Sequence, residues 1–378
     1  MEIPRNAPPM NRILMTADTL GGVWTYSLEL ANALANWNIE IFLATMGRKL
    51  SEHQWAAANK IENLHIIESD FKVEWMNDPW QDVEEAGKWL LDLEQQVQPH
   101  LIHLNNYAHG DLPWNAPVLM TAHSDVFSWH AYVKNKTPDR NWFTYHKWVE
   151  NGLKAADHVV AITKSVEKDL KAQYYYATPT SVIHNGLSSE GFAKSNKENF
   201  VLSVGRIWDE AKNFRTLNEA ARFCSVPIAV AGENRHPETG NKTEFEHLYF
   251  TGNLERDKLS HYMGRAAVYC LPATYEPFGY TPLEAALCGC ALVLSDLESL
   301  NEIWQDAAIY FNPEDPLELA DQLKRVVADK SLRSQLATRA MKRAKTLSAT
   351  NMAANYMKLY QKLVNHDYAT KLMTAYAN

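Results

Sequence analysis

The chain has 378 residues, of which 46% are hydrophobic and 22% are charged, and its formal net charge is −8. This balance is typical of a folded globular protein and excludes a disordered chain, and the length suffices for two domains with their own cores. An overall negative charge does not favour nucleic acid or anionic lipid as a partner, although a local basic patch is compatible with it.

Short apolar strands alternate with helical patterns through the first half of the chain. Alternation of this kind is typical of a parallel sheet that is covered by helices. A helix is expected after Gly22, and another over residues 84–96. The expected strands cover residues 12–16, 39–43, 100–104, 118–122 and 158–162.

The same alternation starts again after a strand that runs into a turn over residues 182–186. In the tail, Asp315 is expected to cap a helix whose first residue is Pro316, and a long helical region covers residues 331–363. The second series predicts strands at 200–204, 228–231, 247–250, 268–271 and 291–294, with helices at 216–224, 256–266 and 282–288.

The two series predict two domains of the doubly wound α/β class, with a boundary near Gly186. Ligands of such domains bind at the carboxyl ends of the strands, where loops and helix N-termini converge. Two such domains placed face to face enclose a cleft. We therefore expect the functional residues at strand-to-helix junctions of both halves.

The most informative string is Tyr-Glu-Pro-Phe-Gly-Tyr-Thr-Pro-Leu-Glu-Ala at residues 275–285, between a strand and a helix. Pro282 suits the start of a helix, and Gly279 allows the backbone to approach a ligand closely. Free N–H groups at a helix start bind anions such as a diphosphate. Glu276 in the loop and Glu284 one turn inside the helix can both accept hydrogen bonds from sugar hydroxyls. Taken singly, each also fits an ordinary surface carboxylate.

A pair of cations follows the strand at residues 200–204. Arg206 and Lys212 both lie in the loop between this strand and the next helix. Two cations at a strand end suit a leaving diphosphate. The alternative is that both are solvated and pair with Asp209 and Glu210.

Two weaker strings lie in the first half. Gly21 and Gly22 separate the first strand from its helix, as in a glycine-rich phosphate loop. They have neither GxGxxG nor GxxxxGK[ST] spacing, so an ordinary tight turn is the alternative. His123 follows the strand at 118–122 and can contact a sugar, or it can be a structural histidine.

In this combination and order, the strings resemble the retaining glycosyltransferases of the GT-B fold, in the family 4 class (glycosyl transferases group 1). The resemblance covers nearly the whole chain, and the glutamate pair with seven residues between its members is its most specific mark. It implies two Rossmann-like domains that face each other across a cleft. Residues 1–185 would bind the acceptor and residues 186–355 the nucleotide sugar, and residues 356–378 would form a helix that can cross back to the first domain.

The resemblance also implies roles for individual positions. Arg206 and Lys212 would hold the leaving diphosphate, Glu276 and His123 would contact the donor sugar, and these four are the expected catalytic residues. Glu284 would bind the ribose hydroxyls. The remaining donor contacts would come from Gly21, Gly22, Phe278, Gly279, Tyr280, Thr281 and, against the nucleobase, Asn253 and Leu254.

The implied reaction retains the anomeric configuration without a covalent enzyme intermediate, because the departing phosphate oxygen takes the proton of the acceptor. The two cations and a helix N-terminus would replace a divalent metal, and no Asp-X-Asp motif lies at a suitable strand end. We therefore expect no metal and no cofactor. UDP-glucose is the favoured donor, and the acceptor is expected to be a hydroxyl of a saccharide, a glycolipid or a small metabolite.

Tryptophan is concentrated in the first half of the chain. Aromatic faces stack on sugars, so Trp114, Trp129 and Trp142, near the His123 loop, are candidate acceptor contacts, with core packing as the alternative. The stretch at 134–148 mixes cations and aromatic residues. It fits an anionic acceptor or a lipid surface, or a solvated face.

Two other functions stay open. A nucleotide-sugar epimerase or hydrolase would act on the donor without an acceptor, whereas a non-catalytic protein would bind the donor without turnover. A dehydrogenase is disfavoured, because GxGxxG is absent.

The expected location follows from the absence of targeting signals. The N-terminus has no signal peptide, and no run approaches the roughly 18 apolar residues of a membrane span. None of the four cysteines forms a CxxC pair, which favours buried thiols in a reducing compartment over a metal site. We expect a cytoplasmic protein with no nucleic-acid partner, and the sequence does not indicate peripheral membrane contact.

Overall fold

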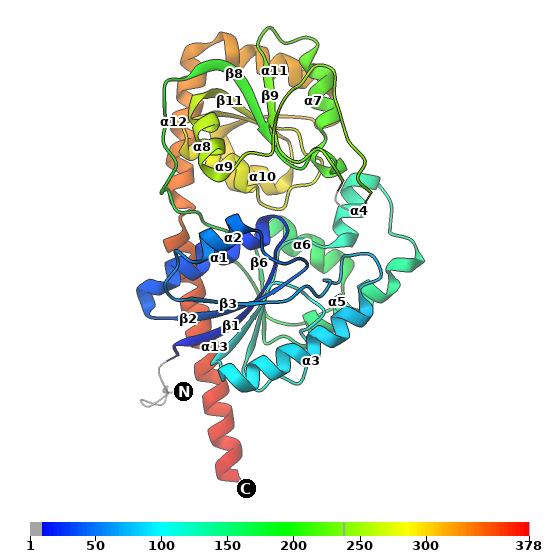
Figure 1. Ribbon diagram of the computed structural model, residues 1–378, viewed down its shortest axis with the longest axis vertical. Helices are drawn as coiled ribbons and strands as arrows, with labels where there is room; N and C mark the ends of the chain where they lie inside the picture. The colour runs from blue at the N-terminus through cyan, green and yellow to red at the C-terminus, as the bar shows by residue number, and fades with distance from the viewer. Residues whose placement is uncertain (1–9, 237–238, 378) are drawn as a thin grey trace. The chain divides into compact units, whose positions relative to one another are not determined.

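The computed structural model describes residues 10–236 and 239–377, with side chains described up to residue 371. The chain divides into two compact units. Unit 1 holds the chain up to Ser128, together with Thr137–Gly186 and the C-terminal segment from Ala349, whereas unit 2 holds Trp129–Lys136 and Leu187–Ser348. Figure 1 shows each unit as a sheet with helices packed around it.

The sheet of unit 1 has seven strands in the order β3-β2-β1-β4-β5-β6-β7, and every neighbouring pair is parallel. β1, β4, β5 and β6 are almost fully buried, because helices cover both faces of a parallel sheet. The strands are β1 (Arg12–Asp18), β2 (Glu40–Met46), β3 (Leu64–Glu68), β4 (Leu101–Leu104), β5 (Val118–Ala122), β6 (His158–Ala161) and β7 (Thr180–Val182).

The sheet of unit 2 has six parallel strands in the order β10-β9-β8-β11-β12-β13. Both orders reverse direction beside the first strand of the unit, which is the doubly wound arrangement that the sequence predicts. The strands are β8 (Glu198–Val204), β9 (Ile228–Ala231), β10 (Tyr249–Gly252), β11 (Ala266–Leu271), β12 (Ala291–Ser295) and β13 (Ala308–Phe311). The predicted α/β class with two Rossmann-like domains is thereby confirmed.

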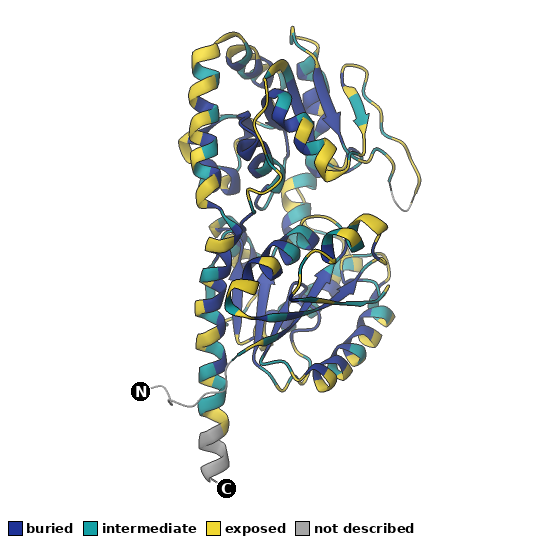
Figure 2. Ribbon diagram, turned by 60° about the vertical axis from the view of Figure 1, so that its left-hand side comes forward, coloured by how far each residue is buried: buried dark blue, intermediate teal, exposed yellow. Residues whose placement is uncertain are grey.

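Helices surround both sheets and turn their exposed faces to solvent (Figure 2). The helices that begin in the first half are α1 (Gly22–Leu34), η1 (Ala35–Trp37), α2 (Glu52–Ala58), α3 (Trp80–Val97), α4 (Val126–Lys134), η2 (Arg140–Trp142), α5 (Phe143–Ala155) and α6 (Lys164–Gln173). The later ones are η3 (Glu210–Lys212), α7 (Phe214–Ala221), α8 (Arg256–Arg265), α9 (Tyr280–Leu287), α10 (Glu298–Trp304), η4 (Gln305–Ala307), α11 (Pro316–Ala328), α12 (Lys330–Thr346) and α13 (Ala349–Ala377).

The helical tail contains one confirmed prediction and one correction. Asp315 caps α11, since its Oδ1 accepts hydrogen bonds from the N–H groups of Leu317 and Glu318 at 2.9 Å each, with Pro316 as the first helical residue. The long helical region expected at 331–363 is two helices, because Leu347 leaves the helical conformation. The break assigns α12 to unit 2 and α13 to unit 1.

A buried polar cluster joins α13 to the sheet of unit 1. His103 on β4 lies 2.6 Å (Nδ1) from the hydroxyl of Tyr360 and 2.8 Å (Nε2) from the hydroxyl of Thr121. The hydroxyl of Tyr356 also lies 3.1 Å from that of Thr121. The side chains of this cluster are 0–1% exposed. Burial lowers the pKa of His103 to about 3, so the ring is neutral in the folded protein.

This cluster predicts acid sensitivity. The unfolded chain binds a proton at His103 below the ordinary pKa of about 6.5, whereas the folded protein does not do so until the pH approaches 3. The stabilisation is therefore complete above pH 6.5 and is lost as the pH falls through this window. We expect His103 alone to lower the free energy of unfolding by about 2 kcal/mol between pH 8 and pH 5.

Urea unfolding at both pH values checks this expectation. His103→Gln should make the pH dependence shallower by that amount, while His261→Gln, which removes an exposed histidine of α8, is the control. An equal pH dependence in wild type and His103→Gln would contradict the prediction.

Candidate active site

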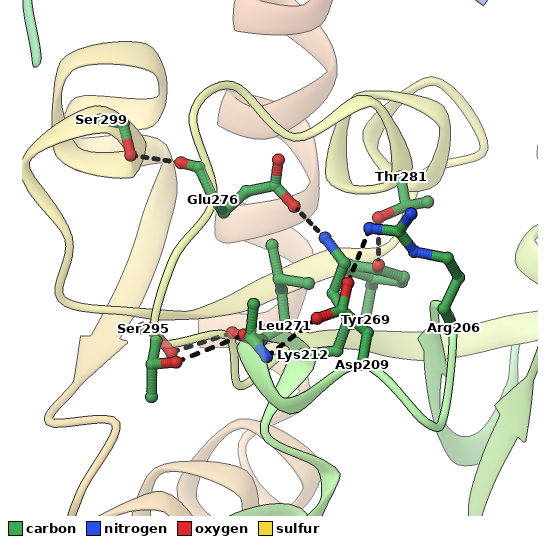
Figure 3. A network of polar contacts seen from close by, with 11 residues as sticks. Arg206, Asp209, Lys212, Tyr269, Leu271, Glu276, Thr281, Ser295 and Ser299 are labelled. Atoms are coloured by element: carbon green, nitrogen blue, oxygen red, sulfur yellow. Dashed lines mark hydrogen bonds and ion pairs between the residues drawn. The ribbon is translucent and has the colours of Figure 1, made fainter. Parts of the chain in front are cut away.

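The two main strings of unit 2 meet where the strand order reverses. β8 ends at Val204 and is followed by Arg206 and η3, whereas the neighbouring β11 ends at Leu271 and is followed by the loop to α9. Lys212 Nζ lies 2.8 Å from Glu276 Oε2, although the two residues are 64 positions apart (Figure 3). Their side chains are 19% and 14% exposed, so the pair is largely enclosed but reachable from solvent.

Backbone contacts hold the two loops together. The N–H of Thr274 donates to the carbonyl oxygen of Ala211 at 2.9 Å, and Asn213 Nδ2 donates to that of Pro272 at the same distance. Asn213 has a φ of 52°, a left-handed conformation that asparagine adopts more readily than most residues. On the other side of the loop, Ser299 Oγ donates to the carbonyl oxygen of Glu276 at 2.5 Å (Figure 3).

Arg206 is held on two sides. Its Nη2 donates to Asp209 Oδ2 at 2.6 Å, and its guanidinium carbon lies 5.2 Å from the centre of the Trp208 ring. Asp209 is 8% exposed, and its other carboxylate oxygen accepts the N–H of Ala211. Arg206 therefore forms the ion pair with Asp209 that the sequence analysis gave as the alternative to phosphate binding. Lys212 instead pairs with Glu276. The Arg206 side chain itself is 47% exposed, which leaves it accessible to an anion.

Gly279 immediately precedes α9, and its backbone conformation allows the chain to turn into the helix. This residue has a φ of 90°, and a Cβ built on it would lie 2.8 Å from Cγ of Pro282, so the chain requires glycine there. The helix begins at Tyr280, two residues earlier than expected, and Pro282 is its third residue. Thr281 is fixed by the hydroxyl of Tyr269, which donates to its Oγ1 at 2.6 Å (Figure 3). The first turn of α9 therefore follows directly on the Glu276 loop.

The remaining predicted donor residues of unit 2 lie at two places. Phe278 is buried and Glu284 is partly exposed, one turn inside α9. Asn253 and Leu254 follow β10, at the edge of the sheet that lies beyond β9, and Asn253 is exposed. Their contact with a nucleobase stays a prediction.

In unit 1, the predicted residues follow β1 and β5. Gly21 caps α1 with a φ of 82°, and both Gly21 and Gly22 are exposed. His123 follows β5 and is partly buried, with its Nε2 2.9 Å from Asn105 Oδ1. Burial lowers the pKa of His123 to about 3, so the ring is neutral at physiological pH.

The three candidate tryptophans belong to different units. Trp114 Nε1 donates to the carbonyl oxygen of His109 at 2.8 Å, and Trp142 packs edge-on against Tyr145, both in unit 1. Trp129 belongs to unit 2, where Lys134 lies over its ring at 5.7 Å. All three are partly exposed.

Sequence reasoning missed the residues that hold the predicted ones in place. The sequence pattern marks Asp209 only as a competing partner of a cation, and it marks neither Trp208 nor Asn105. Spacing could have suggested Asp209, because a carboxylate three positions after an arginine in a short loop can reach it. The partners of His123 carry no such local signal.

The described part of the chain holds neither a metal-binding cluster nor a helix that could span a membrane. No three His, Cys, Asp or Glu side chains there form a group that could hold a metal ion. No helix there has both the length and the apolar character needed to cross a bilayer.

Comparison with known proteins identifies the family of the chain. Residues 20–190 match the family model of Glycosyltransferase Family 4, and residues 187–343 match that of Glycosyl transferases group 1. The O-antigen chain mannosyltransferase RfbU of Salmonella typhimurium is 26% identical over 189 residues, which are 46% of this chain and 52% of that protein. The chain therefore spans about half the length of this relative.

Solved structures of other proteins share the fold of this chain over nearly its whole length. Sucrose-phosphate synthase from Thermosynechococcus elongatus superposes with a TM-score of 0.79 at 20% identity, covering 93% of this chain and 99% of that one. HepE from Anabaena, solved in complex with UDP-glucose, has a TM-score of 0.74 at 16% identity and covers 93% and 100%. With both halves matched by family models and the fold shared throughout, the chain belongs to the GT-B glycosyltransferases of the family 4, group 1 class.

Proposed function

We propose that this protein transfers a hexose from a nucleotide sugar, with UDP-glucose as the favoured donor, to a hydroxyl of its acceptor with retention of anomeric configuration. The observation that carries the proposal is the pair of Lys212 and Glu276 beside Arg206, at the point where the strand order of unit 2 reverses. A cation and a carboxylate at one site suit the two ends of a glycosyl diphosphate. The cation would bind phosphate and the carboxylate would bind sugar hydroxyls.

In the proposed reaction, the bond between the anomeric carbon and the phosphate oxygen breaks, and a bond to the acceptor oxygen forms on the same face. The proton of the acceptor hydroxyl goes to the departing phosphate oxygen. Arg206 and Lys212 stabilise the charge that develops on the diphosphate, and the N–H groups of the first turn of α9 add to it. We expect this set to work without a divalent metal.

The other roles are part of the same proposal. Glu276 and His123 would contact hydroxyls of the donor sugar, and Glu284 would bind the ribose. Gly22 would approach the phosphate closely. The acceptor would be a saccharide, a glycolipid or a small metabolite.

Two observations bear on the donor. HepE was solved with UDP-glucose and also with UDP, which favours a UDP-hexose. RfbU is a mannosyltransferase, which favours a mannosyl donor as the second candidate. A panel of UDP-glucose, UDP-galactose, UDP-N-acetylglucosamine, ADP-glucose and GDP-mannose, with and without EDTA, separates them by thermal shift and nucleotide release.

The outcomes of this panel decide between the open functions. One donor that raises the melting temperature and is slowly hydrolysed despite EDTA supports a metal-independent transferase. Stabilisation without any release of nucleotide supports a non-catalytic binding protein. Conversion of the donor to an epimer supports an epimerase, and the absence of any shift rejects the donor site.

Retention can be tested before the acceptor is known. Slow hydrolysis uses water as the acceptor, so proton NMR of the first glucose released from UDP-glucose reports the configuration. Release of α-glucose is expected, and release of β-glucose would mean inversion.

Asp209 should matter to turnover because it orients Arg206. Asp209→Asn keeps an oxygen for the N–H of Ala211 but loses the charged hydrogen bond to Arg206. We expect kcat/KM for donor turnover to fall roughly tenfold, the scale of one hydrogen bond to a charged group. Asp321→Asn, which breaks the exposed pair with Lys324 on α11, is the control. Equal kinetics in the two variants would contradict the assignment.

A further inference from the structure

His123 and Asn105 lie at the ends of adjacent strands of unit 1. Asn105 directly follows β4 and His123 directly follows β5, and these strands pair in parallel. His123 Nε2 lies 2.9 Å from Asn105 Oδ1. No other hydrogen bond links the His123 ring to a residue in the described part of the chain.

The orientation of the Asn105 amide follows from its second partner. Asn105 Nδ2 lies 2.8 Å from the backbone carbonyl oxygen of Thr16, an atom that can only accept a hydrogen bond. The amide nitrogen must therefore face Thr16, and the amide oxygen must face His123. Thr16 Oγ1 also accepts the backbone N–H of Asn105 at 2.9 Å, so the residue is held by both its backbone and its side chain.

This orientation decides which nitrogen of His123 carries the proton. An amide oxygen can only accept, so Nε2 must donate, and a neutral imidazole with a proton on Nε2 has a lone pair on Nδ1. The ring is also held in place by Tyr26 of α1, which packs against it edge-on with 4.6 Å between the ring centres. Burial keeps the ring neutral, because it disfavours the imidazolium.

We propose that Asn105, anchored by Thr16, is a positioning residue that fixes His123 as the Nε2–H tautomer, so that Nδ1 accepts a hydrogen bond from a hydroxyl of the donor sugar. The identity of the ligand rests on the proposed function, whereas the tautomer does not. An Nδ1 lone pair requires a donor group on the ligand, which a sugar hydroxyl supplies and a fully ionised phosphate does not. His123 would therefore distinguish the sugar end of the donor from its diphosphate.

The first experiment reads the tautomer without any ligand. Nitrogen-15 NMR of the full chain with labelled histidine distinguishes a protonated ring nitrogen from one that carries a lone pair, and His123→Gln assigns the signals. At pH 7 we expect an Nε2–H proton protected from exchange and an unprotonated Nδ1. Asn105→Ala should lose the protected proton.

Asn63→Ala is the matched control for that variant. Asn63 is 7% exposed, against 8% for Asn105, and it also donates to backbone carbonyl oxygens within unit 1, those of Ala31 and Ile39. It should retain the protected proton of His123. A proton on Nδ1, or a charged ring at pH 7, in the wild type would overturn the proposal.

The second experiment compares UDP-glucose with UDP, which lacks the sugar. In Asn105→Ala we expect the affinity for UDP-glucose to fall about tenfold and that for UDP to stay within twofold of wild type. Equal weakening of both ligands would mean that Asn105 only supports the fold, and unchanged affinity for both would remove His123 from the sugar site. If the wild type does not bind UDP-glucose, the donor proposed above is wrong, and the NMR result still decides the role of Asn105.

The third experiment uses Asn105→Asp and a pH profile. A carboxylate at this position would still accept from Nε2 and would stabilise the imidazolium, which raises the pKa of His123. Tyr26 of α1 and His103 of β4 are titratable groups that also lie near the ring. The acid limb of kcat/KM should move to higher pH by at least about one unit, because protonation converts Nδ1 from an acceptor to a donor. A loss of activity of equal size at every pH would indicate a purely structural effect and would contradict the proposal.

Discussion

Lys212→Ala is expected to lower kcat for donor turnover by ~10²–10³, the scale found when one preorganised electrostatic stabiliser is removed. Lys212 lies 2.8 Å from Glu276 and is only 19% exposed, so its charge acts in a partly desolvated site. Its loss also leaves Glu276 without this counter-charge, which disfavours a bound anion. Steady-state release of nucleotide from the preferred donor measures the effect.

Lys258→Ala is the matched control for this variant. It removes the same charge from unit 2, but Lys258 is 67% exposed and pairs with Glu255 on the surface of α8. Surface pairs contribute little, so its kinetics should match wild type. Turnover of Lys212→Ala within about threefold of this control would mean that the cation does not stabilise the leaving group, and the proposed mechanism would fail.

Gly232→Ala is expected to destabilise unit 2 more than other single changes near the site. Gly232 follows β9 with a φ of 146°, and a Cβ built on it would lie 1.9 Å from the carbonyl oxygen of Gly205. That oxygen belongs to the turn that delivers Arg206, and a backbone atom cannot move aside as a flexible side chain can. We expect a loss of about 3–5 kcal/mol in the free energy of unfolding, because strain and steric overlap act together.

Gly252→Ala separates the two causes of that loss. Gly252 also has a positive φ, 80°, but nothing lies within 4 Å of a Cβ built on it. It should lose only the roughly 1–2 kcal/mol of backbone strain. Differential scanning calorimetry of both variants measures the difference. A melting temperature of Gly232→Ala equal to that of Gly252→Ala would show that the close approach to Gly205 relaxes at little cost.

Local signals in the sequence were sufficient for much of the architecture. The buried strands β5 and β9 begin and end at the predicted residues, because each is a short apolar run flanked by residues that break the pattern. Asp315 and Pro316 mark the start of α11 because the capping bonds span only two or three residues.

Two strands and one helix break were not predicted from the sequence. β3 and β13 are edge strands, each paired on one side only, and their side chains are less completely buried than those of the central strands. The break between α12 and α13 also depends on a distant contact, since the N–H of Leu187 donates to the carbonyl oxygen of Leu347 at 3.0 Å. Such contacts leave no periodic pattern in the sequence.

For the site, the sequence alone determined which charged residues follow the strand ends. The positions of Arg206, Lys212, Glu276 and Glu284 relative to the expected strands and helices can be read from the sequence. Only the tertiary structure decided their partners. Lys212 meets Glu276 because β8 and β11 are neighbours in the sheet, and His123 meets Asn105 because β4 and β5 are. The physical reason is that hydrophobic periodicity defines each strand by itself, whereas the order of the strands, and with it every pairing between strand ends, comes from packing of the whole unit.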